Sequence, residues 1–455
     1  MSGRPRRIHL AILTALLFCV SAMPARAATI IVTNTNDSGP GSLRQALRVA
    51  NDGDMITFAV TGSIALTSGG LPVNKNLMIS GPGKDQLSVD GNQALLVFGV
   101  FPDKTATISD LTIRNGQTGI WNEHGTLTVS NCAVSGNAEV GLFNDGVPSV
   151  LTVSNCIVSG NLYGIYNDHG EASVSNCIVS SNQSGGVFDN GVAGGPSDHI
   201  FGSGTLTIAD SIINDNSGPG VDNNSGGVTI VDSTISGNSV GKTGGGVYTY
   251  QNGGKIPGSL TVISSTISGN FASSAGGGIA CGLSGLTIIN STISGNSAGA
   301  YGGGIANGSL GVMIVNSTVS GNSAATCGGI CGGTIEIGNT ILNANAAGNI
   351  DGSVTSRGYN VCSDDAGGLL NGPGDQINTD PLLGPLRDHG GPTLTHLPLR
   401  GSPAIDAGDP NFTPPPFHDQ RGPCFDRVFG GRIDVGSVET QLRPRCVTPR
   451  PRPTP

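Results

Sequence analysis

Residues Gly285–Gly308 read GLTIINSTISGNSAGAYGGGIANG, and variants of this stretch recur along the middle of the chain. Within it, apolar and polar residues alternate in three short segments around Leu286, Ile293 and Ile305. Such alternation predicts half-buried β-strands, and the Gly, Asn and Ser residues between the segments predict turns. Three strands and three turns in about two dozen residues predict one coil of a parallel β-solenoid.

The other copies share this pattern but differ in length and in how closely they match. They are Gly227–Gly253, Ser259–Gly282 and Gly311–Gly333, with more divergent copies from Gly125, Ser149, Glu171 and Gly204. A single coil cannot bury its apolar face alone, whereas stacked coils can, at an interstrand spacing of about 4.8 Å. The composition agrees, because 74 Gly without a collagen period and 37% hydrophobic residues argue against disorder.

Two columns of residues line up when the copies are stacked. Apolar residues occupy the inward position of each second strand: Val134, Val158, Val179, Ile213, Ile235, Ile267, Ile293, Val319 and Ile341. Three residues further on stand Asn137, Asn161, Asn182, Asn216, Asn238, Asn270, Asn296 and Asn322, while the last copy has Ala344 there and Asn345 one residue later. Because an Asn amide in a tight turn can bond to the next copy, we favour a structural ladder over a ligand groove.

The chain begins with the pattern of a secretion signal. Arg4, Arg6 and Arg7 precede an apolar run, and Ala25-Arg26-Ala27 gives an A-x-A cleavage site. The apolar run is too short for a membrane anchor, and no other stretch is apolar and long enough to span a bilayer. Residues 1–27 are therefore predicted to be a signal peptide, and the mature protein to be secreted or at the cell surface, without a transmembrane segment.

The charge balance argues against one class of partner. Of the 22 Lys and Arg, four lie in residues 1–27 and four after Glu439, which leaves 14 against 31 Asp and Glu. Phosphate contacts need a basic face, so nucleic acid is not expected as a partner. Neutral glycans or divalent cations fit this balance better.

Nine of the ten Cys remain once Cys19 leaves with the signal, so at least one is unpaired in a monomer. Cys132, Cys156 and Cys177 share one inward column, which favours small buried thiols, although neighbouring coils are close enough for a disulfide. The Cys327 and Cys331 pair has no second pair or His at zinc spacing. The disulfide pairing stays open.

The ends of the chain differ from the repeats. Ser42 to Ala50 predicts a short amphipathic helix, capped by Ser42, that covers the first coil. The repeats fade after Asn345, and a Pro-rich, basic tail closes the chain. The predicted organisation is a signal peptide in 1–27, a β-helix with its N-terminal cap in 28–362, a C-terminal cap in 363–440 and a tail in 441–455.

Residues 380–439 resemble the region called the choice-of-anchor Q domain in secreted bacterial β-helix proteins. The matching motifs are DPLLGPLRDHGGPTLTHLPLRGSPAIDAGD from Asp380, DQRG from Asp419 and IDVGSVE from Ile433. The opening NDSGPGSLRQALRVANDGDMITF and the Gly- and Asn-rich repeats also resemble such proteins and the chlamydial polymorphic outer-membrane protein group. The resemblance implies an all-β, right-handed parallel β-helix of the pectin-lyase-like kind at the cell surface or beyond it, and it implies no established reaction.

A row of aromatic and acidic residues is the best candidate binding surface. Trp121, Phe143, Tyr166 and Phe188 each follow an inward apolar residue, so they point outward from four successive coils. Glu123, Asp145 and Asp168 stand two residues after the first three rings, and Asn190 after the fourth. Exposed rings can stack on sugars and aligned carboxylates can hold Ca²⁺, although no cofactor is required. The alternative is that the insert between Phe188 and Thr205, or a partner strand, covers the rings.

Two further groups are interpreted as structural. Thr234, Thr266, Thr292 and Thr318 point outward from the second strand, where Thr is a good strand residue and its ladders stabilise sheets. In the C-terminal region, His396, Asp406, Asp419, Arg421, Asp434 and Glu439 are predicted to form a charge network that holds the cap over the last coil. A metal or catalytic cluster is the alternative for these six residues.

Enzyme chemistry is the minority interpretation. Asp364-Asp365, Asn378-Thr379-Asp380 and Asp388-His389-Gly390 have the wrong order and spacing for a pectin hydrolase. A lyase needs an Arg or Lys base beside calcium-binding carboxylates, and the repeats contain few basic residues. We therefore expect an adhesive or structural scaffold that binds an extracellular glycan or a cell-surface component. A polysaccharide lyase or glycoside hydrolase on the same fold is the alternative.

Overall fold

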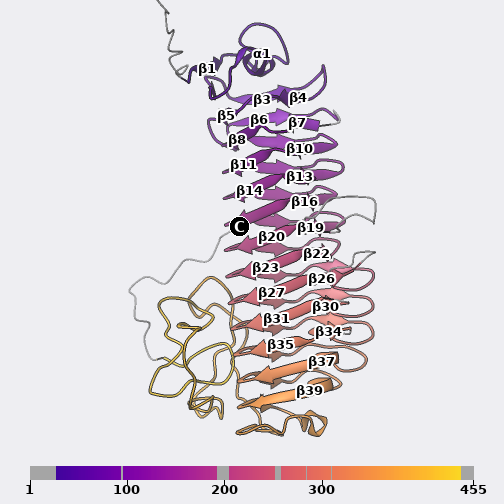
Figure 1. The fold of residues 1–455 in the computed structure, drawn as a ribbon, viewed down its shortest axis with the longest axis vertical. Helices are drawn as coiled ribbons and strands as arrows, with labels where there is room; N and C mark the ends of the chain where they lie inside the picture. The colour runs from indigo at the N-terminus through magenta and orange to yellow at the C-terminus, as the bar shows by residue number, and fades with distance from the viewer. Residues whose placement is uncertain are drawn as a thin grey trace, which may run out of the picture.

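The computed structural model describes residues 27–93, 96–191, 204–251, 258–282, 284–308 and 310–441. They form an elongated solenoid with the C-terminal region beside it (Figure 1). Within these ranges, every pairing between named strands is parallel, as in Trp121 opposite Phe143 and Ile267 opposite Ile293. No helix in the described part of the chain is long and apolar enough to cross a membrane. The predicted signal peptide and tail lie outside the described residues, apart from Ala27 and Gln441.

Three faces of stacked strands build the solenoid. The first contains β1 (Thr29–Val32), β2 (Met55–Phe58), β5 (Leu77–Ser80), β8 (Thr105–Ser109), β11 (Thr126–Ser130), β14 (Val150–Ser154), β17 (Glu171–Ser175), β20 (Thr205–Ala209), β23 (Gly227–Val231), β27 (Ser259–Ile263), β31 (Gly285–Ile289) and β35 (Val312–Val315). The second contains β3 (Gly62–Ala65), β6 (Leu87–Asp90), β9 (Thr112–Arg114), β12 (Ala133–Ser135), β15 (Ile157–Ser159), β18 (Ile178–Ser180), β21 (Ile212–Asn214), β24 (Thr234–Ser236), β28 (Thr266–Ser268), β32 (Thr292–Ser294), β36 (Thr318–Ser320), β38 (Ile341–Asn343) and β40 (Val361–Cys362).

The third face carries the candidate site. It contains β4 (Leu71–Val73), β7 (Leu96–Val100), β10 (Thr118–Glu123), β13 (Val140–Asp145), β16 (Tyr163–Asp168), β19 (Gly185–Asn190), β22 (Val221–Asn224), β26 (Val247–Tyr250), β30 (Ile279–Cys281) and β34 (Ile305–Asn307). The long strands β37 (Ile330–Gly338) and β39 (Ile350–Gly358) continue both the first and the third face. Short strands β25 (Ser239–Val240), β29 (Phe271–Ala272) and β33 (Ser297–Ala298) pair separately.

The inward column of the second face is confirmed from Val134 to Val319, whose members have no exposed surface. Its last member is different from the prediction. Val319 pairs with Leu342, whereas Ile341 pairs with Thr318 and faces out from the solenoid. Ile341 and Leu342 are adjacent apolar residues, either of which fits the inward position, and a shift of one residue turns a strand's side chains to the opposite face.

A ladder of asparagines runs along one inner corner, as predicted. Asn137, for example, donates from its backbone N and its Nδ2 to Oδ1 of Asn161, at 3.0 and 2.9 Å. The same pair of bonds joins Asn322 to Asn345, at 2.9 and 2.8 Å. Asn345 stands three residues after the inward Leu342, so the last coil keeps the ladder. The side chains are buried, so the ladder is structural and does not form a ligand groove.

A second ladder, made of thiols and hydroxyls, runs along the solenoid beside the asparagine ladder. The backbone N of Cys132 donates to Sγ of Cys156, that of Cys156 to Sγ of Cys177, and that of Cys177 to Oγ of Ser211. The three thiols are free and buried, which confirms the interpretation of this column as small buried side chains. A disulfide joins Cys327 to Cys331, a pairing that the sequence left open.

A second buried amide ladder was not predicted. Nδ2 of Asn122 donates to Oδ1 of Asn144, Asn144 to Asn167, and Asn167 to Oδ1 of Asp189, at 2.7, 2.7 and 2.6 Å. Asp189 takes the place of an Asn, has no exposed surface, and its Oδ2 has no hydrogen-bond partner. Burial raises the pKa of the Asp189 carboxyl to about 7.

The N-terminal cap forms as predicted. Helix α1 (Leu43–Val49) begins after Ser42, whose Oγ accepts a hydrogen bond from the backbone N of Gln45 at 3.2 Å. Leu43 and Leu47 point into the solenoid core. The helix lies across the first coil (Figure 1), where it covers apolar residues that would otherwise meet water.

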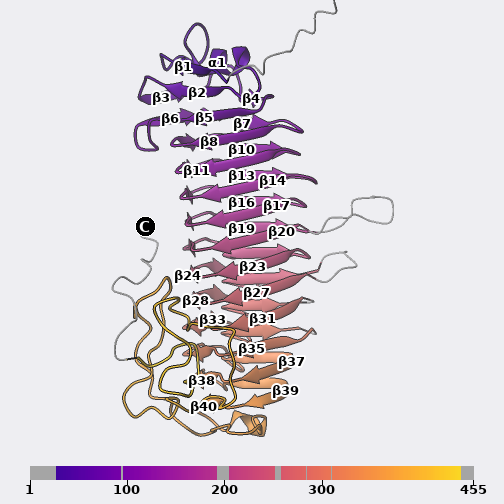
Figure 2. The same cartoon turned by 60° about the vertical axis from the view of Figure 1, so that its left-hand side comes forward.

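The C-terminal region is arranged differently from the prediction. Residues after β40, including the short 3-10 helix η1 (Ala366–Gly368), close the last coil, and Leu370 joins the main core there. The chain then folds back along the second face, as Figures 1 and 2 show in yellow. The region from about residue 380 is therefore attached to the flank of the solenoid and does not lie over its last coil.

This attachment buries part of the predicted threonine row. Oγ1 of Thr292 donates to Oε1 of Gln420 at 2.6 Å, and Oγ1 of Thr266 donates to the carbonyl of Leu394 at 2.6 Å. Gln420 Nε2 donates in turn to Thr266 Oγ1 at 2.9 Å, and Ser437 N donates to Thr318 Oγ1. These three threonines point outward from their strands as predicted, but they bind the C-terminal region and do not form an open stripe.

We predict that Asp189→Asn stabilises the protein at pH 8. The folded-state pKa lies above the usual value, so the folded state holds an extra proton between about pH 4 and 7, and this site's contribution to stability falls as pH rises through that window. Asn continues the ladder without a charge, so the free energy of unfolding in urea should rise by about 1–3 kcal/mol at pH 8 and by less at pH 5.

The control for this test is Asp351→Asn, because Asp351 is exposed on β39. It should change stability at neither pH. A loss of stability in Asp189→Asn at pH 8 would contradict the assignment of Asp189 as a buried carboxyl whose ionisation destabilises the fold.

Candidate functional site

The four predicted aromatic residues form one column on the third face. Parallel pairing places Trp121 opposite Phe143, Phe143 opposite Tyr166, and Tyr166 opposite Phe188. Successive ring centroids are 5.8, 5.3 and 4.5 Å apart. Each ring is half-buried, because neighbouring rings cover part of its surface. The column is thus a partly open wall of rings in contact, in which Trp121 and Phe143 stack and Phe143 meets Tyr166 edge to face. The rings are neither fully exposed nor fully covered. Most of the insert between Phe188 and Thr205 lies outside those residues.

The wall continues further than the sequence analysis recognised. Tyr163 lies 6.0 Å from Tyr166 and 6.2 Å from Phe188 between ring centroids. Tyr248 and Tyr250 stack on each other at 4.7 Å two coils later. The alternation in VYTY of β26 indicates two outward tyrosines. The long insertions before β26 obscured how this strand aligns with the strands that carry the other rings.

One carboxyl group interrupts the wall. Asp222 pairs with Phe188 on one side and with Tyr248 on the other, so it occupies a ring position in the column. Its Oδ1 is buried without a hydrogen-bond partner. Burial raises the pKa of the Asp222 carboxyl to about 7, and this carboxyl was also missed because Asp222 stands alone among apolar and amide residues.

The predicted acidic residues form a second column beside the rings. Glu123, Asp145 and Asp168 are in register with one another. Trp121 Nε1 donates to Asp145 Oδ2 at 3.0 Å, and Asp168 Oδ1 lies 2.8 Å from His169 Nδ1. No three His, Cys, Asp or Glu side chains among the described residues gather closely enough to hold a metal ion, so the three acids form a row and not a cluster.

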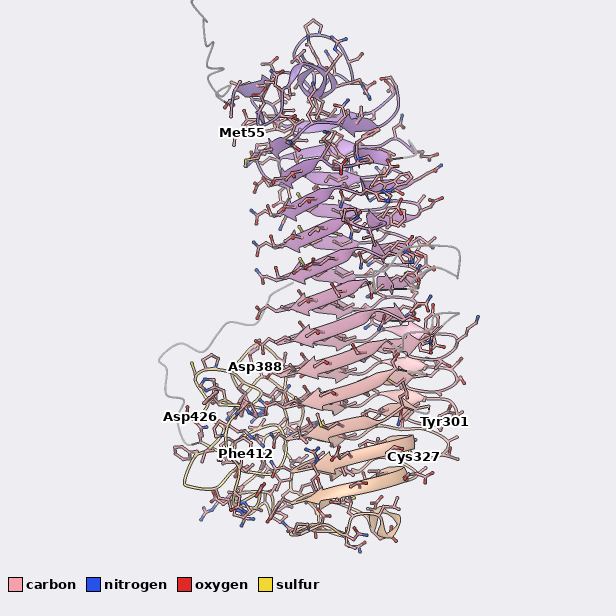
Figure 3. The ribbon with its side chains drawn as sticks, in the orientation of Figure 1. Met55, Tyr301, Cys327, Asp388, Phe412 and Asp426 are labelled. Carbon is pink, nitrogen blue, oxygen red and sulfur yellow. A yellow bond between two sulfur atoms is a disulfide. The ribbon has the colours of Figure 1, made fainter. Side chains whose placement is uncertain are left out.

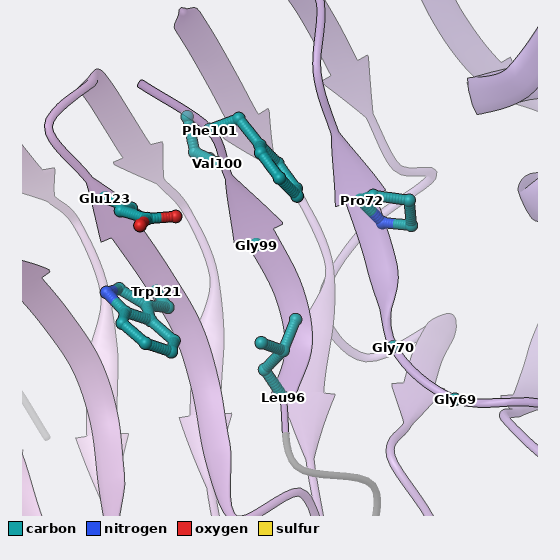
Figure 4. A pocket seen from close by; sticks show the side chains of 9 residues that line it. All are labelled: Gly69, Gly70, Pro72, Leu96, Gly99, Val100, Phe101, Trp121 and Glu123. Atoms are coloured by element: carbon teal, nitrogen blue, oxygen red, sulfur yellow. The ribbon is translucent and has the colours of Figure 1, made fainter.

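A groove opens beside the first ring of the column. Figure 4 shows Trp121 and Glu123 on one side and Pro72 on the other, with Leu96 and Phe101 between them. The groove has a volume of about 520 Å³, and Gly69, Gly70, Gly99 and Val100 complete its lining. A mainly apolar groove with one carboxylate at its edge suits a ligand with both an apolar face and polar groups.

Four of the six predicted C-terminal charges form a buried network. Arg421 Nη2 donates to Asp419 Oδ2 at 2.6 Å and to the carbonyl of Glu439 at 2.6 Å. Glu439 Oε2 accepts from the backbone N of Asp434 at 2.8 Å. Burial, together with the nearby Asp434, raises the pKa of the Glu439 carboxyl to about 8. These bonds join residues within the C-terminal region, which lies on the flank of the solenoid, whereas the predicted network held a cap over the last coil.

The other two predicted C-terminal charges, His396 and Asp406, lie apart from this buried network. His396 Nε2 contacts Ser294 Oγ at 2.9 Å and so connects the region to β32. Asp406 is exposed, and only its backbone N reaches Asp434 Oδ1. Arg427, which the sequence analysis did not single out, is buried completely and donates to the carbonyls of Asp434 and Gly436.

The acidic motifs considered as hydrolase candidates accept hydrogen bonds from backbone N atoms in turns. Asp364 Oδ1 accepts from the backbone N of Ala366, and Asp364 Oδ2 accepts from that of Asn349. Asp388 Oδ1 accepts from the backbone N of Gly390. The described residues therefore give these motifs a structural role.

Comparison with known proteins supports the fold. Residues 79–195 match the family model described as the right handed beta helix region, which agrees with the predicted handedness. No curated protein matches the sequence significantly. The resemblance of residues 380–439 to the choice-of-anchor Q domain, and that of the repeats to the chlamydial proteins, stay predictions.

Solved structures that resemble this one include polysaccharide-active enzymes. The pectate lyase Pel9A is 15% identical, with 91% of this chain and 96% of that chain covered and a TM-score of 0.46. The A-module of the mannuronan C-5 epimerase AlgE6 from Azotobacter vinelandii is 14% identical over 76% and 93%, with a TM-score of 0.47. The catalytic domain of a GH87 α-1,3-glucanase is 16% identical over 75% and 68%, with a TM-score of 0.39. These similarities are too distant to transfer an activity.

We predict that Phe143→Ala exposes Trp121, the single tryptophan of the chain. Phe143 stacks on Trp121 at 5.8 Å, so its removal should shift the tryptophan emission to the red and increase quenching by acrylamide. Phe188→Ala, in the same column but three coils away, is the matched control and should leave the emission unchanged. Equal spectra for all three proteins would show that the rings do not stack on each other in solution.

Proposed function

We propose that the protein is an exported β-helical scaffold that binds a glycan along the third face, between Trp121 and Tyr250. The observation that carries the proposal is the column of half-buried rings on consecutive coils. Aromatic faces left partly open on a rigid sheet offer stacking surfaces for the apolar faces of sugar rings. The proposal includes export because residues 1–27 have the pattern of a signal peptide.

Two further features support this function. The rings sit on strands whose inward residues are buried, so the platform is rigid before the ligand arrives and less entropy is lost on binding. The groove beside Trp121 extends the platform toward the N-terminal end of the solenoid. A role as an adhesive surface component is consistent with a long face of repeated contacts, because repeated weak contacts add up to strong attachment.

Tyr166→Ala should weaken binding of an oligosaccharide by about 1–3 kcal/mol, the range for stacking on aromatic platforms. Trp121 emission reports binding, because it belongs to the same column two coils away. Binding is screened first on a glycan array, with and without Ca²⁺, which also tests the predicted calcium site.

Tyr301→Ala is the matched control. Tyr301 is exposed and lies beyond the column, at the edge of the solenoid away from the C-terminal region (Figure 3). Its loss should not change affinity. Equal affinity of the Tyr166→Ala variant and the parent protein would contradict the proposed role of the column.

An enzyme that cleaves the glycan is the second candidate, and Asp222 favours it. A carboxyl with a pKa of about 7 can donate a proton at neutral pH, as a general acid of glycoside hydrolysis must. If the protein has this activity, Asp222→Asn should abolish the release of reducing ends and leave binding, followed by Trp121 emission, within about twofold. Reducing ends released at the parent rate by Asp222→Asn would exclude Asp222 as the acid.

A further inference from the structure

The acidic column and the aromatic column repeat with the same period. Both advance by one strand per coil, at about 4.8 Å, because Glu123, Asp145 and Asp168 stand two residues after Trp121, Phe143 and Tyr166 on paired strands. A ligand that places a ring on the first column therefore meets a carboxylate beside it on every coil. This pairing of a flat apolar surface with a negative charge is repeated three times.

Hydrogen bonds position two of these three carboxylates, and each of the three keeps an oxygen without a donor in the part of the chain that the structure describes. Asp145 accepts from Trp121, and Asp168 accepts from Asn190 Nδ2 at 2.7 Å and contacts His169. Among the described residues, nothing donates to the Glu123 carboxylate, to Asp145 Oδ1 or to Asp168 Oδ2. Each acid thus keeps a free acceptor oxygen, and each side chain is only half-buried, so the oxygens remain within reach of a ligand.

The face carries no balancing cation on its strands. Strands β10, β13, β16, β19, β22 and β26 contain five Asp or Glu and no Lys or Arg. Basic residues stand in the turns beside these strands: His124 and His169 follow β10 and β16, and Lys104 lies in the neighbouring turn one coil before His124. A polymer of uronic acids would meet repulsion along this whole row, whereas a polymer with ammonium groups would meet attraction.

We propose that the ligand of this face is a glycan of amino sugars, whose rings stack on Trp121, Phe143 and Tyr166 while its ammonium groups pair with Glu123, Asp145 and Asp168. This inference rests on the proposed glycan-binding function and adds the chemical class of the ligand. The stacking surface favours a glycan over a cationic peptide, because each ring lies beside its carboxylate at the same spacing on each coil.

The test titrates the full mature protein with three probes at pH 6 and low salt, using Trp121 emission. The probes are hexamers of β-linked glucosamine, of N-acetylglucosamine and of galacturonic acid. Half-exposed ion pairs are individually weak, so three of them should give glucosamine an advantage of about tenfold over the acetylated hexamer. Added salt should reduce that advantage, because it screens exposed charges.

The combined variant Glu123→Gln, Asp145→Asn and Asp168→Asn should abolish this advantage and leave binding of the acetylated hexamer unchanged. The single variant Glu123→Gln is included because Glu123 has no partner among the described residues, so its loss should not disturb folding. It should reduce the advantage of the glucosamine hexamer by about twofold. Glu139→Gln, at an exposed acid outside the row, is the matched control and should change nothing.

The outcomes separate this inference from the proposed function. Equal binding of the glucosamine and acetylated hexamers, or tighter binding of the galacturonic acid hexamer, would overturn the inference and keep the proposed function. Competition by oligolysine as strong as that of the glucosamine hexamer would overturn it as well, because the face would then be a general site for cations. Binding of none of the three hexamers would overturn the proposed function itself.

Discussion

The hydrogen bonds between asparagine amides of successive coils are the constraint on which the rest of the structure depends. Each buried Asn donates twice to the next, from its backbone and from its side chain, as Asn137 does to Asn161. A buried amide left without these partners would be costly, so a coil that slips out of register is strongly disfavoured. Insertions are accommodated in the loops, and the ladder keeps the strands aligned on either side of them.

This register has a direct consequence on the outer surface. On the third face, the buried Asn144 Nδ2 donates to Oδ1 of Asn167, so the residues just before these two amides, Phe143 and Tyr166, lie side by side on β13 and β16. The same alignment places Asp145 beside Asp168. The candidate binding face is therefore a result of internal packing, in which a row of polar interior bonds sets the spacing of rings and carboxylates outside.

Much of the coil could be predicted from the sequence, because alternation and the Asn column are local signals. The inward column, the N-terminal helix and the outward direction of the four aromatic residues all follow from such patterns. The prediction placed Ile341 in the core, whereas Leu342 occupies that position. The neighbouring coils, and not the local pattern, decide which of these two adjacent apolar residues turns inward.

Long-range packing accounts for the other differences. The threonine row looks like an open stripe in the sequence, yet Thr292 is bound by Gln420, 128 residues later. The Asn122 ladder was missed because its members stand between the more conspicuous aromatic and acidic residues. Asp222 and Tyr248 belong to the same wall as Trp121, but insertions hide their common register. A local sequence pattern does not show which distant segments contact or align with each other.

Unfolding of a variant that lacks one complete coil tests the central claim most directly. Deletion of residues 138–161 removes one full step of the ladder, the 24 positions from Asn137 to Asn161, and joins Asn137 to Leu162. The account predicts that this variant keeps a β-type circular dichroism spectrum and unfolds in one cooperative transition, whereas deletion of residues 138–149, about half a coil, abolishes both. Similar unfolding of the two variants would contradict the claim that the buried ladders set the register of the solenoid.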